Sequence, residues 1–281
     1  MFINMRYLVI TLIAVFLALG IGILIGFQLD SQDIILQQQD DLIKSLENKF
    51  DQLTQTNQSL ENQIKQLQSN IERDQAFMKN IFADYVQNKL SGLTVTIIET
   101  SESSLYPQLK YALETAGATI NTSIVVTDKI LSTAEEQQSP EPELPIAAII
   151  ADAIAYGQTK SINTLQQQGF IEIKGNFDTT CDFVIIVGGS NEETKKPEIV
   201  DVPLIQELKK MSINVVGVES SDAGYSYMDY YKKEQISTVD NVDTIIGQTS
   251  LVLIMTGQQG NYGIKASAGA LIPSFGKEEP R

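Results

Sequence analysis

Histidine is absent from this chain of 281 residues, and cysteine occurs once, as Cys181. Without an imidazole, neither a Ser-His-Asp triad nor a Cys-His nucleophile can be assembled, so hydrolases of these classes are excluded. A single thiol cannot form a disulfide within one chain, which excludes a disulfide framework. These absences point away from an enzyme, and we expect no catalytic residues.

Basic residues are scarce relative to acidic ones. Lysine and arginine total 20 against 35 aspartates and glutamates, so the formal net charge is −15. A surface that binds nucleic acid needs clustered lysine and arginine to neutralise phosphates, so this balance predicts no nucleic-acid partner. The acidity favours solubility, and a surface that attracts cations is the alternative interpretation.

The longest apolar run extends from Tyr7 to Phe27 and contains no charged residue. About 20 residues at ~1.5 Å each cross the hydrocarbon core, so residues 7–27 are predicted to be an uncleaved transmembrane helix. The alternative is a cleaved signal peptide, but its apolar region would be shorter and a small-residue cleavage site would follow. Arg6 precedes the span and the next basic residue is Lys44. The positive-inside rule therefore places residues 1–6 in the cytoplasm and everything after Phe27 outside it, which predicts a single-pass protein of the cell membrane.

Small residues recur every four positions along the span, from Ala14 through Ala18, and Gly22 and Gly26 form a GxxxG pair. Positions four apart lie on one helix face, where small side chains let two backbones approach closely. Glycine and alanine are also common in membrane helices that do not pair. Together with the segment that follows, the pattern predicts pairing through Ala18, Gly22 and Gly26.

Residues 30–90 contain neither proline nor glycine and show a heptad repeat. The a positions hold Leu36, Ile43, Phe50, Asn57, Ile64, Ile71 and Met78. The d positions hold Gln39, Leu46, Leu53, Leu60, Leu67, Asp74 and Ile81. This narrow apolar stripe predicts a coiled-coil stalk roughly 70 Å long.

We expect the stalk to pair two copies as a parallel homodimer. An asparagine at a single a position favours two strands in one register, at a cost in stability. The alternative is an amphipathic helix that packs on the chain's own domain, but the stripe is as narrow as a strict a/d seam. The predicted dimerisation residues of the stalk are Leu46, Leu53, Asn57, Leu60, Ile64 and Leu67.

Beyond Gly92 the pattern changes to apolar segments of strand length. Strands are predicted over 93–98, 119–126, 183–187 and 213–218, with a short strand or helix exit over 170–173. They alternate with predicted helices over 106–116, 146–168, 202–211 and 244–255, and an acidic, proline-broken loop covers 139–145. Such alternation with near-continuously apolar strands predicts a parallel sheet covered on both faces. The predicted fold class is α/β, with a Rossmann-like or flavodoxin-like extracytoplasmic domain over residues 92–265 and a flexible tail over 266–281.

The Gly188-Gly189 pair follows a predicted strand, where phosphate-binding loops lie in open α/β folds. Neither G-x-G-x-x-G nor G-x-x-x-x-G-K-[ST] is present, and the next helix begins only near Val202. We therefore interpret the pair as a structural turn, and we predict no cofactor-binding residues.

Two further groups in this domain have alternative interpretations. Asp240 and Asp243 have the spacing of paired carboxylates, but turn and N-cap positions before the helix at Thr244 suit them better. The tyrosines between residues 225 and 231 form an aromatic cluster that is either a surface for a partner or part of the packing.

Two segments resemble the MctB-type copper transporter family of bacterial envelope proteins. They are AVFLALGIGILIG at 14–26, and ISTVDNVDTIIGQTSLVLIM with the following GNYGIK at 236–265. The order of anchor, coiled coil and α/β domain also matches, whereas residues 132–176 are generic. The resemblance implies copper export or limitation of intracellular copper, but it implies no particular ligand residues.

Copper(I) prefers cysteine, methionine and histidine ligands. This chain offers Cys181 and six methionines that are scattered without a Met-x-x-Met pair. Cys181 precedes an apolar strand, a position that suits a small buried residue better than a ligand. We therefore predict no metal site, and copper enters only through the resemblance. The alternative to a copper-related role is a dimeric envelope scaffold that presents its α/β domain to a cell-wall or division partner.

Overall fold

The computed structural model describes residues 5–101, 105–131, 146–157, 159–177 and 180–274; of residues 28–37 it describes the backbone only. One helix, α1 (Met5–Val86), contains both the predicted span and most of the predicted stalk. The chain divides into two units, Met1–Arg73 and Asp74–Arg281. The predicted loop over 139–145 lies outside the described residues, as does the end of the predicted tail.

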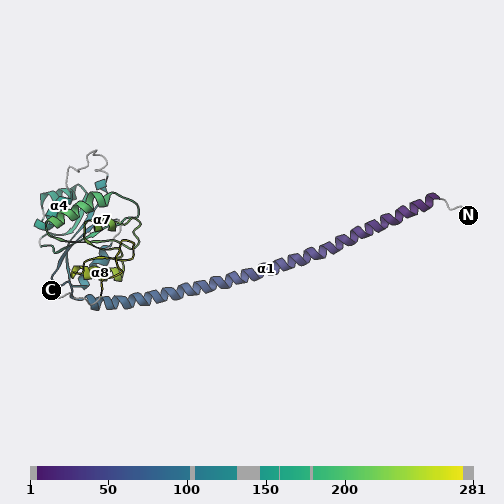
Figure 1. Ribbon diagram of the computed structural model, residues 1–281, viewed down its shortest axis with the longest axis horizontal. Coiled ribbons are helices and arrows are strands. Elements are labelled where there is room, and N and C mark those ends of the chain that lie inside the picture. The colour runs from purple at the N-terminus through teal and green to yellow at the C-terminus, as the bar shows by residue number, and fades with distance from the viewer. Residues whose placement is uncertain (1–4, 102–104, 132–145, 158, 178–179, 275–281) are drawn as a thin grey trace. The chain divides into compact units, whose positions relative to one another are not determined.

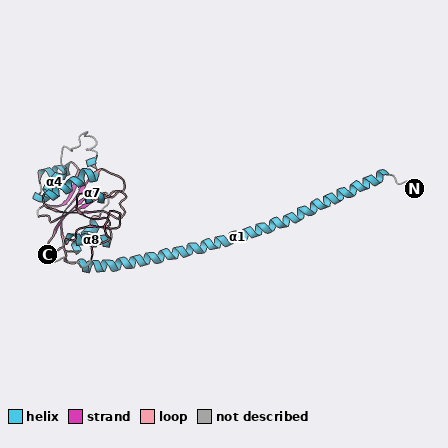
Figure 2. Cartoon of the chain, in the orientation of Figure 1, coloured by secondary structure: helices cyan, strands magenta, loops and turns pink. Residues whose placement is uncertain are grey.

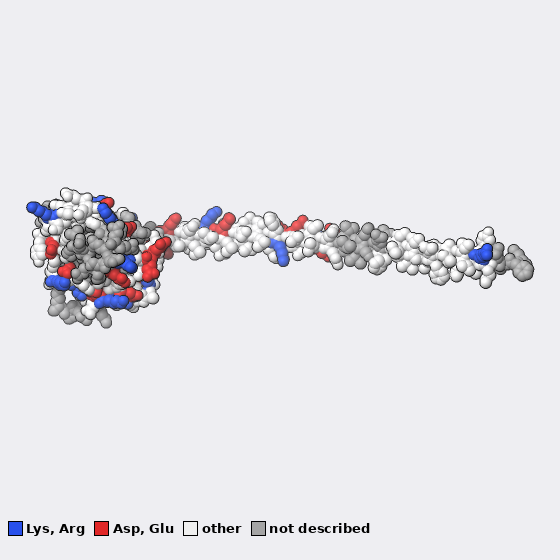
Figure 3. Space-filling model, turned by 90° about the horizontal axis from the view of Figure 1, so that it is seen from above, with Lys and Arg blue, Asp and Glu red and all other residues white. Residues whose placement is uncertain are grey.

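The first part of α1 has the properties of a membrane span. Among the described residues, Met5–Phe27 is the one helical stretch long and apolar enough to cross a membrane, with a mean hydropathy of 3.0. All side chains of this stretch are exposed. On the face shown in Figure 3, white side chains cover almost all of it, and red and blue ones begin again beyond the grey segment. The predicted span therefore lies inside a helix of sufficient length.

The second unit is built on a seven-stranded sheet with the strand order β3-β2-β1-β4-β5-β6-β7. Its strands are β1 (Thr94–Glu99), β2 (Thr119–Val126), β3 (Ile171–Gly175), β4 (Phe183–Val187), β5 (Asn214–Val218), β6 (Ser237–Val239) and β7 (Asn261–Tyr262). Neighbouring strands are parallel except that β3 runs antiparallel to β2. The predicted α/β class is thus confirmed, and the prediction of a wholly parallel sheet is wrong at β3.

Helices cover both faces of the sheet, and each face has its own apolar core. One core contains α4 (Ile146–Tyr156), α5 (Lys160–Gln167), α6 (Val202–Lys210) and α7 (Met228–Lys233). The other contains α2 (Tyr106–Thr115), α8 (Ile245–Met255) and the last turns of α1. Figures 1 and 2 show α4 and α7 on one side of the strands and α8 on the other. The expectation of a sheet covered on both faces is therefore confirmed.

The predicted helix over 146–168 is two helices. Gly157 adopts a left-handed φ of 96°, and its backbone N–H bonds the carbonyl of Ala153, which ends α4. The Thr159 side chain then accepts a hydrogen bond from the backbone N–H of Ile162 and caps α5. A glycine followed by an N-cap residue is a helix stop and start signal, and the apolar run through this region obscured it.

The strand order of β3 to β6 is 3-2-1-4-5-6, which is the order of Rossmann folds, but the antiparallel β3 differs from them. The assignment to a Rossmann-like or flavodoxin-like topology stays a prediction. What matters for function is that β1 lies between β2 and β4. After β1 the chain forms β2 and β3 toward one edge of the sheet, and it then forms β4 to β7 on the other side of β1. The loops after β1 and β4 therefore run in opposite directions at the carboxyl ends of these neighbouring strands.

Candidate functional site

The predicted seam of the stalk faces outward in the single chain. Its leucines and isoleucine are between 49% and 63% exposed, although each is an apolar residue on a regular helix. The members with such exposure are Leu46, Leu53, Leu60, Ile64 and Leu67, and Asn57 between them is exposed as well. An apolar stripe of this length on an otherwise polar helix is an unsatisfied packing surface.

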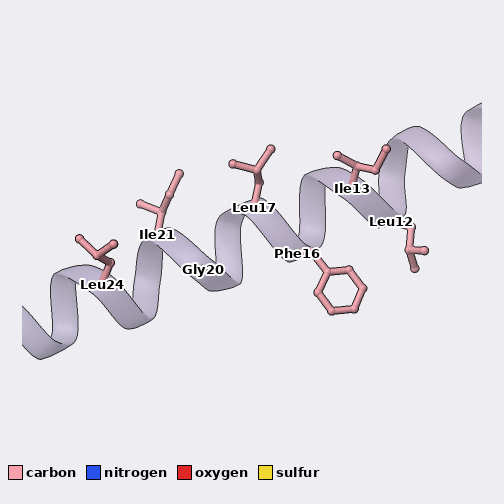
Figure 4. A pocket seen from close by; sticks show the side chains of 7 residues that line it. All are labelled: Leu12, Ile13, Phe16, Leu17, Gly20, Ile21 and Leu24. Atoms are coloured by element: carbon pink, nitrogen blue, oxygen red, sulfur yellow. The ribbon is translucent and has the colours of Figure 1, made fainter.

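The membrane part of α1 carries small residues that its own chain does not need. A Cβ atom added to Gly22 or Gly26 would meet no atom within 4 Å, and the same holds for Gly20. Figure 4 shows a shallow hollow around Gly20, with Leu17 and Ile21 on one side of the helix and Phe16 on the other. Ala18 is likewise exposed. Gly22, Gly26 and Ala18 thus leave a flattened surface on one face of the span without any packing reason inside one chain, whereas Gly20 and its hollow lie on the opposite face.

The last turns of α1 serve the α/β unit and not the seam. Phe82 and Val86 are buried in the core that also contains α2 and α8, and Leu90 follows them there. The d-position residue Ile81 next to them is 50% exposed. The helix therefore presents two apolar faces over these turns. Sequence reasoning assigned every residue up to 90 to the stalk. The apolar residues that face the α/β core follow directly on those of the seam, and both have helical spacing.

Tyrosine side chains pack directly against the Gly188-Gly189 turn at the end of β4. A Cβ atom on Gly188 would lie 2.1 Å from the Tyr231 hydroxyl oxygen and 2.6 Å from a ring carbon of Tyr227. Gly189 has a φ of 85°, which side chains rarely adopt. The pair is therefore needed so that two buried tyrosines can reach the sheet, which supports the interpretation as a structural turn.

The substitution Gly188→Ala is expected to lower the melting temperature of the protein, because its methyl group would overlap both tyrosine side chains. Overpacking of a filled core costs about 1–3 kcal/mol. Gly269→Ala is the matched control, since its nearest neighbour would lie at 3.6 Å. Thermal unfolding of both variants beside the wild type checks the prediction; equal melting temperatures for the two variants would contradict it.

The tyrosine cluster divides into a buried and a surface pair. Tyr227 and Tyr231 are fully buried, with ring centroids 6.5 Å apart in an edge-on arrangement. Tyr225 and Tyr230 are half-buried, and their hydroxyl groups lie 2.9 Å apart. The packing interpretation of the cluster thus holds for the first pair, which sequence reasoning could not separate from the second.

Tyr231 belongs to a buried polar cluster beneath the carboxyl edge of the sheet. Its hydroxyl group donates a hydrogen bond to Asp201 Oδ2, and the Thr100 hydroxyl lies 3.0 Å from the same oxygen. Asp201 is fully buried, and its Oδ1 has no hydrogen-bond partner among the described residues. Burial raises the pKa of Asp201 to about 7, against the lowering effect of Tyr231, Thr100 and the Lys196 charge. Sequence reasoning missed this cluster, because Asp201 lies 101 residues from Thr100 and 30 from Tyr231 along the chain.

Above this cluster lies a cleft of about 450 Å³ at the carboxyl ends of the strands. Lys196 is only 4% exposed, and its Nζ lies 2.5 Å from Asp128 Oδ1 and 3.1 Å from the backbone oxygen of Thr100. The cleft is lined by Thr100, Asp128, Leu131, Ser190, Asn191, Glu192, Glu193, Thr194, Lys196 and Tyr227. It thus combines the buried ammonium group of Lys196 with the carboxylates of Asp128, Glu192 and Glu193. No sequence motif predicted this combination.

Asp240 and Asp243 bind backbone groups of other loops. The Asp240 carboxylate accepts hydrogen bonds from the backbone N–H groups of residues 264–265, at 2.7 and 3.0 Å. The Asp243 carboxylate accepts two from Ser221, both at 2.7 Å. The N-cap of α8 is Thr244, so the N-cap interpretation of the two aspartates is wrong. Both carboxylates therefore connect loops through hydrogen bonds, and their oxygen atoms are already engaged in these contacts.

Glu219, like Asp240, binds the carboxy-terminal segment that contains residues 264–265. Glu219 is buried, and its Oε1 lies 2.8 Å from Lys265 Nζ and accepts a hydrogen bond from Ser226. Its Oε2 accepts one from the backbone N–H of Tyr227. The segment around GNYGIK is therefore bound to the ends of β5 and β6, which gives this part of the sequence a structural role.

The potential copper ligands of the α/β unit are one cysteine and several methionines. Cys181 is half-buried, and its thiol donates a hydrogen bond to the backbone oxygen of Phe183 at 3.0 Å. Burial raises the pKa of the Cys181 thiol, and the thiolate is the form that binds metals. Met228 is buried in the core against which Cys181 and Met211 also pack, whereas Met255 is buried in the other core. Among the described residues, no group of three histidine, cysteine, aspartate or glutamate side chains could hold a metal ion.

A family model described as "Copper transport outer membrane protein, MctB" matches residues 2–273. The match takes in the apolar span, the heptad region, Cys181 and the cleft, and so includes nearly the whole chain. No curated protein matches this chain.

Proposed function

Because this chain belongs to the MctB family of copper transport outer membrane proteins, we propose that it works in copper export or copper homeostasis as a membrane-anchored envelope protein. The observation that carries the proposal is the family match over residues 2–273. The family is one of copper transport and not of enzymes. The one apolar helix of sufficient length in the described part of the chain fits membrane anchoring.

The protein acts as a parallel homodimer held by α1. The exposed leucine seam and the glycines of the span support this proposal, since one chain leaves both surfaces uncovered. Two copies anchored by the same end in one membrane meet in parallel, and a common anchor raises their effective concentration. Pairing would bury the stripe in knobs-into-holes packing and bring the small residues of the spans together.

The α/β domain lies outside the cytoplasm, with the span uncleaved and residues 1–6 inside. Arg6 before the span and the lack of basic residues up to Lys44 support this orientation. A periplasmic-type reporter fused after Arg281 is expected to be active, and a cytoplasmic one inactive. The reverse result would overturn the orientation, and a mature amino terminus near Phe27 would overturn the anchor.

Copper is the transported cargo in this proposal, and the chain affects it without a tight copper(I) site of its own. Such a site gathers two or three soft ligands. The single thiol of Cys181 is engaged with a carbonyl oxygen and has a raised pKa, and the buried methionines lie in separate cores. A partner in the envelope would therefore bind the metal.

A competition titration of the full-length protein in detergent against a copper(I) chelator is expected to show no stoichiometric binding. The reason is that one thiol leaves the ion open to water and to competing thiols. Cys181→Ser serves as the control. Stoichiometric binding that this variant abolishes would show that the chain handles copper directly, for instance through two Cys181 side chains of a dimer.

Copper content of cells tests the proposed function itself. Cells that lack the protein are expected to accumulate copper, and both the wild type and Cys181→Ser should restore the normal content. A variant with Leu53→Ala and Leu60→Ala should not restore it, because the dimer is needed. Unchanged copper content together with altered cell shape or division would instead favour the scaffold, which the exposed seam also fits.

A further inference from the structure

The cleft above Asp201 lies where open α/β sheets bind ligands. Its walls come from the ends of β1 and from the loops after β2 and β4, through Thr100, Asp128 and Ser190. β1 is flanked by β2 on one side and β4 on the other, so this is the point at which the strand order reverses. Crevices outside the carboxyl ends at such a point are the usual ligand positions. A volume of about 450 Å³ is in the range of small-molecule pockets.

The charges of the cleft are separated by depth. Lys196 and Thr100 are buried and form the floor, whereas Asp128, Glu192 and Glu193 are exposed and form the rim. Burying an ammonium group costs several kcal/mol unless an anion compensates it. The compensating anion here is Asp128, which approaches from a different loop and keeps 65% of its side chain exposed. An exposed carboxylate on a loop can leave this position without a desolvation cost of its own, because it is already in water.

We propose that this cleft binds a small zwitterionic ligand of the amino acid or short-peptide class. The ligand carboxylate takes the place of Asp128 at Lys196 Nζ, and the ligand ammonium group lies at the rim carboxylates of Glu192 and Glu193. Leu131 supplies apolar surface for the rest of the ligand.

The same geometry disfavours other ligand classes. Three carboxylates at the rim repel a nucleotide or another polyanion. The position a phosphate loop would use next to Gly188 is filled by Tyr231. A metal ion lacks its ligand set, since among the described residues no three histidine, cysteine, aspartate or glutamate side chains are placed to hold one. A molecule with one negative and one positive end matches both the floor and the rim.

The test is calorimetric titration of the full-length protein in detergent with each of the twenty common L-amino acids and with glycylglycine. At least one of these probes is expected to bind. The corresponding N-acetyl and carboxamide derivatives should bind at least about tenfold more weakly, because each loses one charge-assisted contact. Binding of none of the probes would overturn the proposal.

Variants then locate the site. Lys196→Met should weaken binding by about tenfold or more, and Glu192→Gln with Glu193→Gln should weaken it as well. Lys110→Met is the matched control, because that lysine is half-exposed on α2, and it should bind as the wild type does. Asp128→Asn should tighten binding, since it removes the internal competitor for Lys196. This last variant also decides the matter if Lys196→Met fails to fold. Weaker binding by Asp128→Asn, or unchanged binding by a folded Lys196→Met, would refute the site.

Discussion

Replacing both Leu53 and Leu60 by alanine is expected to convert the protein from a dimer to a monomer. Both are d-position residues, and both are exposed in the single chain. Truncating a buried leucine costs about 2–5 kcal/mol, and a dimer would lose four such side chains from one seam. Association of this kind rests on burying the apolar stripe, so losses of this size exceed what a coiled coil of this length can spare.

Sedimentation equilibrium of the full-length protein in density-matched detergent measures the mass directly. The fragment 30–90 should also sediment with twice its monomer mass. Gln55→Ala with Asn62→Ala is the matched control, because both positions are exposed on the same helix, opposite the seam, and should leave the dimer intact. A wild-type monomer, or a leucine variant that stays dimeric, would show that the stripe has another partner.

Much of the architecture could be predicted from local pattern. The unbroken region after Asp30 predicted a continuous helix, and α1 runs to Val86. The apolar segments over 119–126 and 183–187 form β2 and β4 with the predicted bounds. The side chains of β4 are almost all buried, so a continuous apolar run is what its environment demands, whereas β2 includes polar residues and is less buried at its start.

The elements that sequence reasoning missed, or left open as it did β3, lack such a demand. β3 is an edge strand with mostly exposed side chains, and its antiparallel direction depends on the path of the preceding chain. α7 is only six residues long, and two of them, Met228 and Tyr231, are buried. β6 and β7 are shorter still. Short elements at an edge are specified by tertiary contacts more than by periodicity.

The cleft and the cluster beneath it were beyond prediction for a related reason. Thr100, Asp201 and Tyr231 come from three separate parts of the chain, and only the sheet brings them together. Each is unremarkable in its own segment. Gly188 is the partial exception, because a glycine at the end of a strand signals close approach of another group. The sequence alone does not identify the group that approaches Gly188 as Tyr231.

The pH dependence of stability is expected to reveal the buried Asp201. Its pKa is raised from the ordinary value of 3.8 to about 7 by burial, so the folded protein holds a proton that the unfolded chain releases. The native state therefore binds more protons between about pH 4 and pH 7, and the free energy of unfolding falls as the pH rises through this window. At about 1.4 kcal/mol per pH unit, the loss amounts to about 4 kcal/mol, and stability is level above the window.

The hydrogen bonds agree with a neutral Asp201. Thr100 Oγ1 lies 3.0 Å from Asp201 Oδ2 and 3.2 Å from the backbone oxygen of Val187, but a hydroxyl group has one proton for these two contacts. If the proton bonds Val187, a protonated carboxyl group can supply the other. Burial also raises the pKa of Tyr231, which keeps that hydroxyl group protonated as a donor to Asp201.

Asp201→Asn tests this argument, because asparagine has nearly the same shape and stays neutral at every pH. Melting temperatures of the full-length protein in detergent, recorded from about pH 4 to pH 8, should be similar for the two proteins at the acidic end. The variant should become increasingly more stable than the wild type as the pH rises from about 4 to 7, and the difference should stay constant above pH 7. Asp229→Asn, an exposed position on α7, is the control and should follow the wild type throughout. If the Asp201 variant follows the wild type as well, the carboxyl group titrates in the ordinary range and the buried cluster holds a charge.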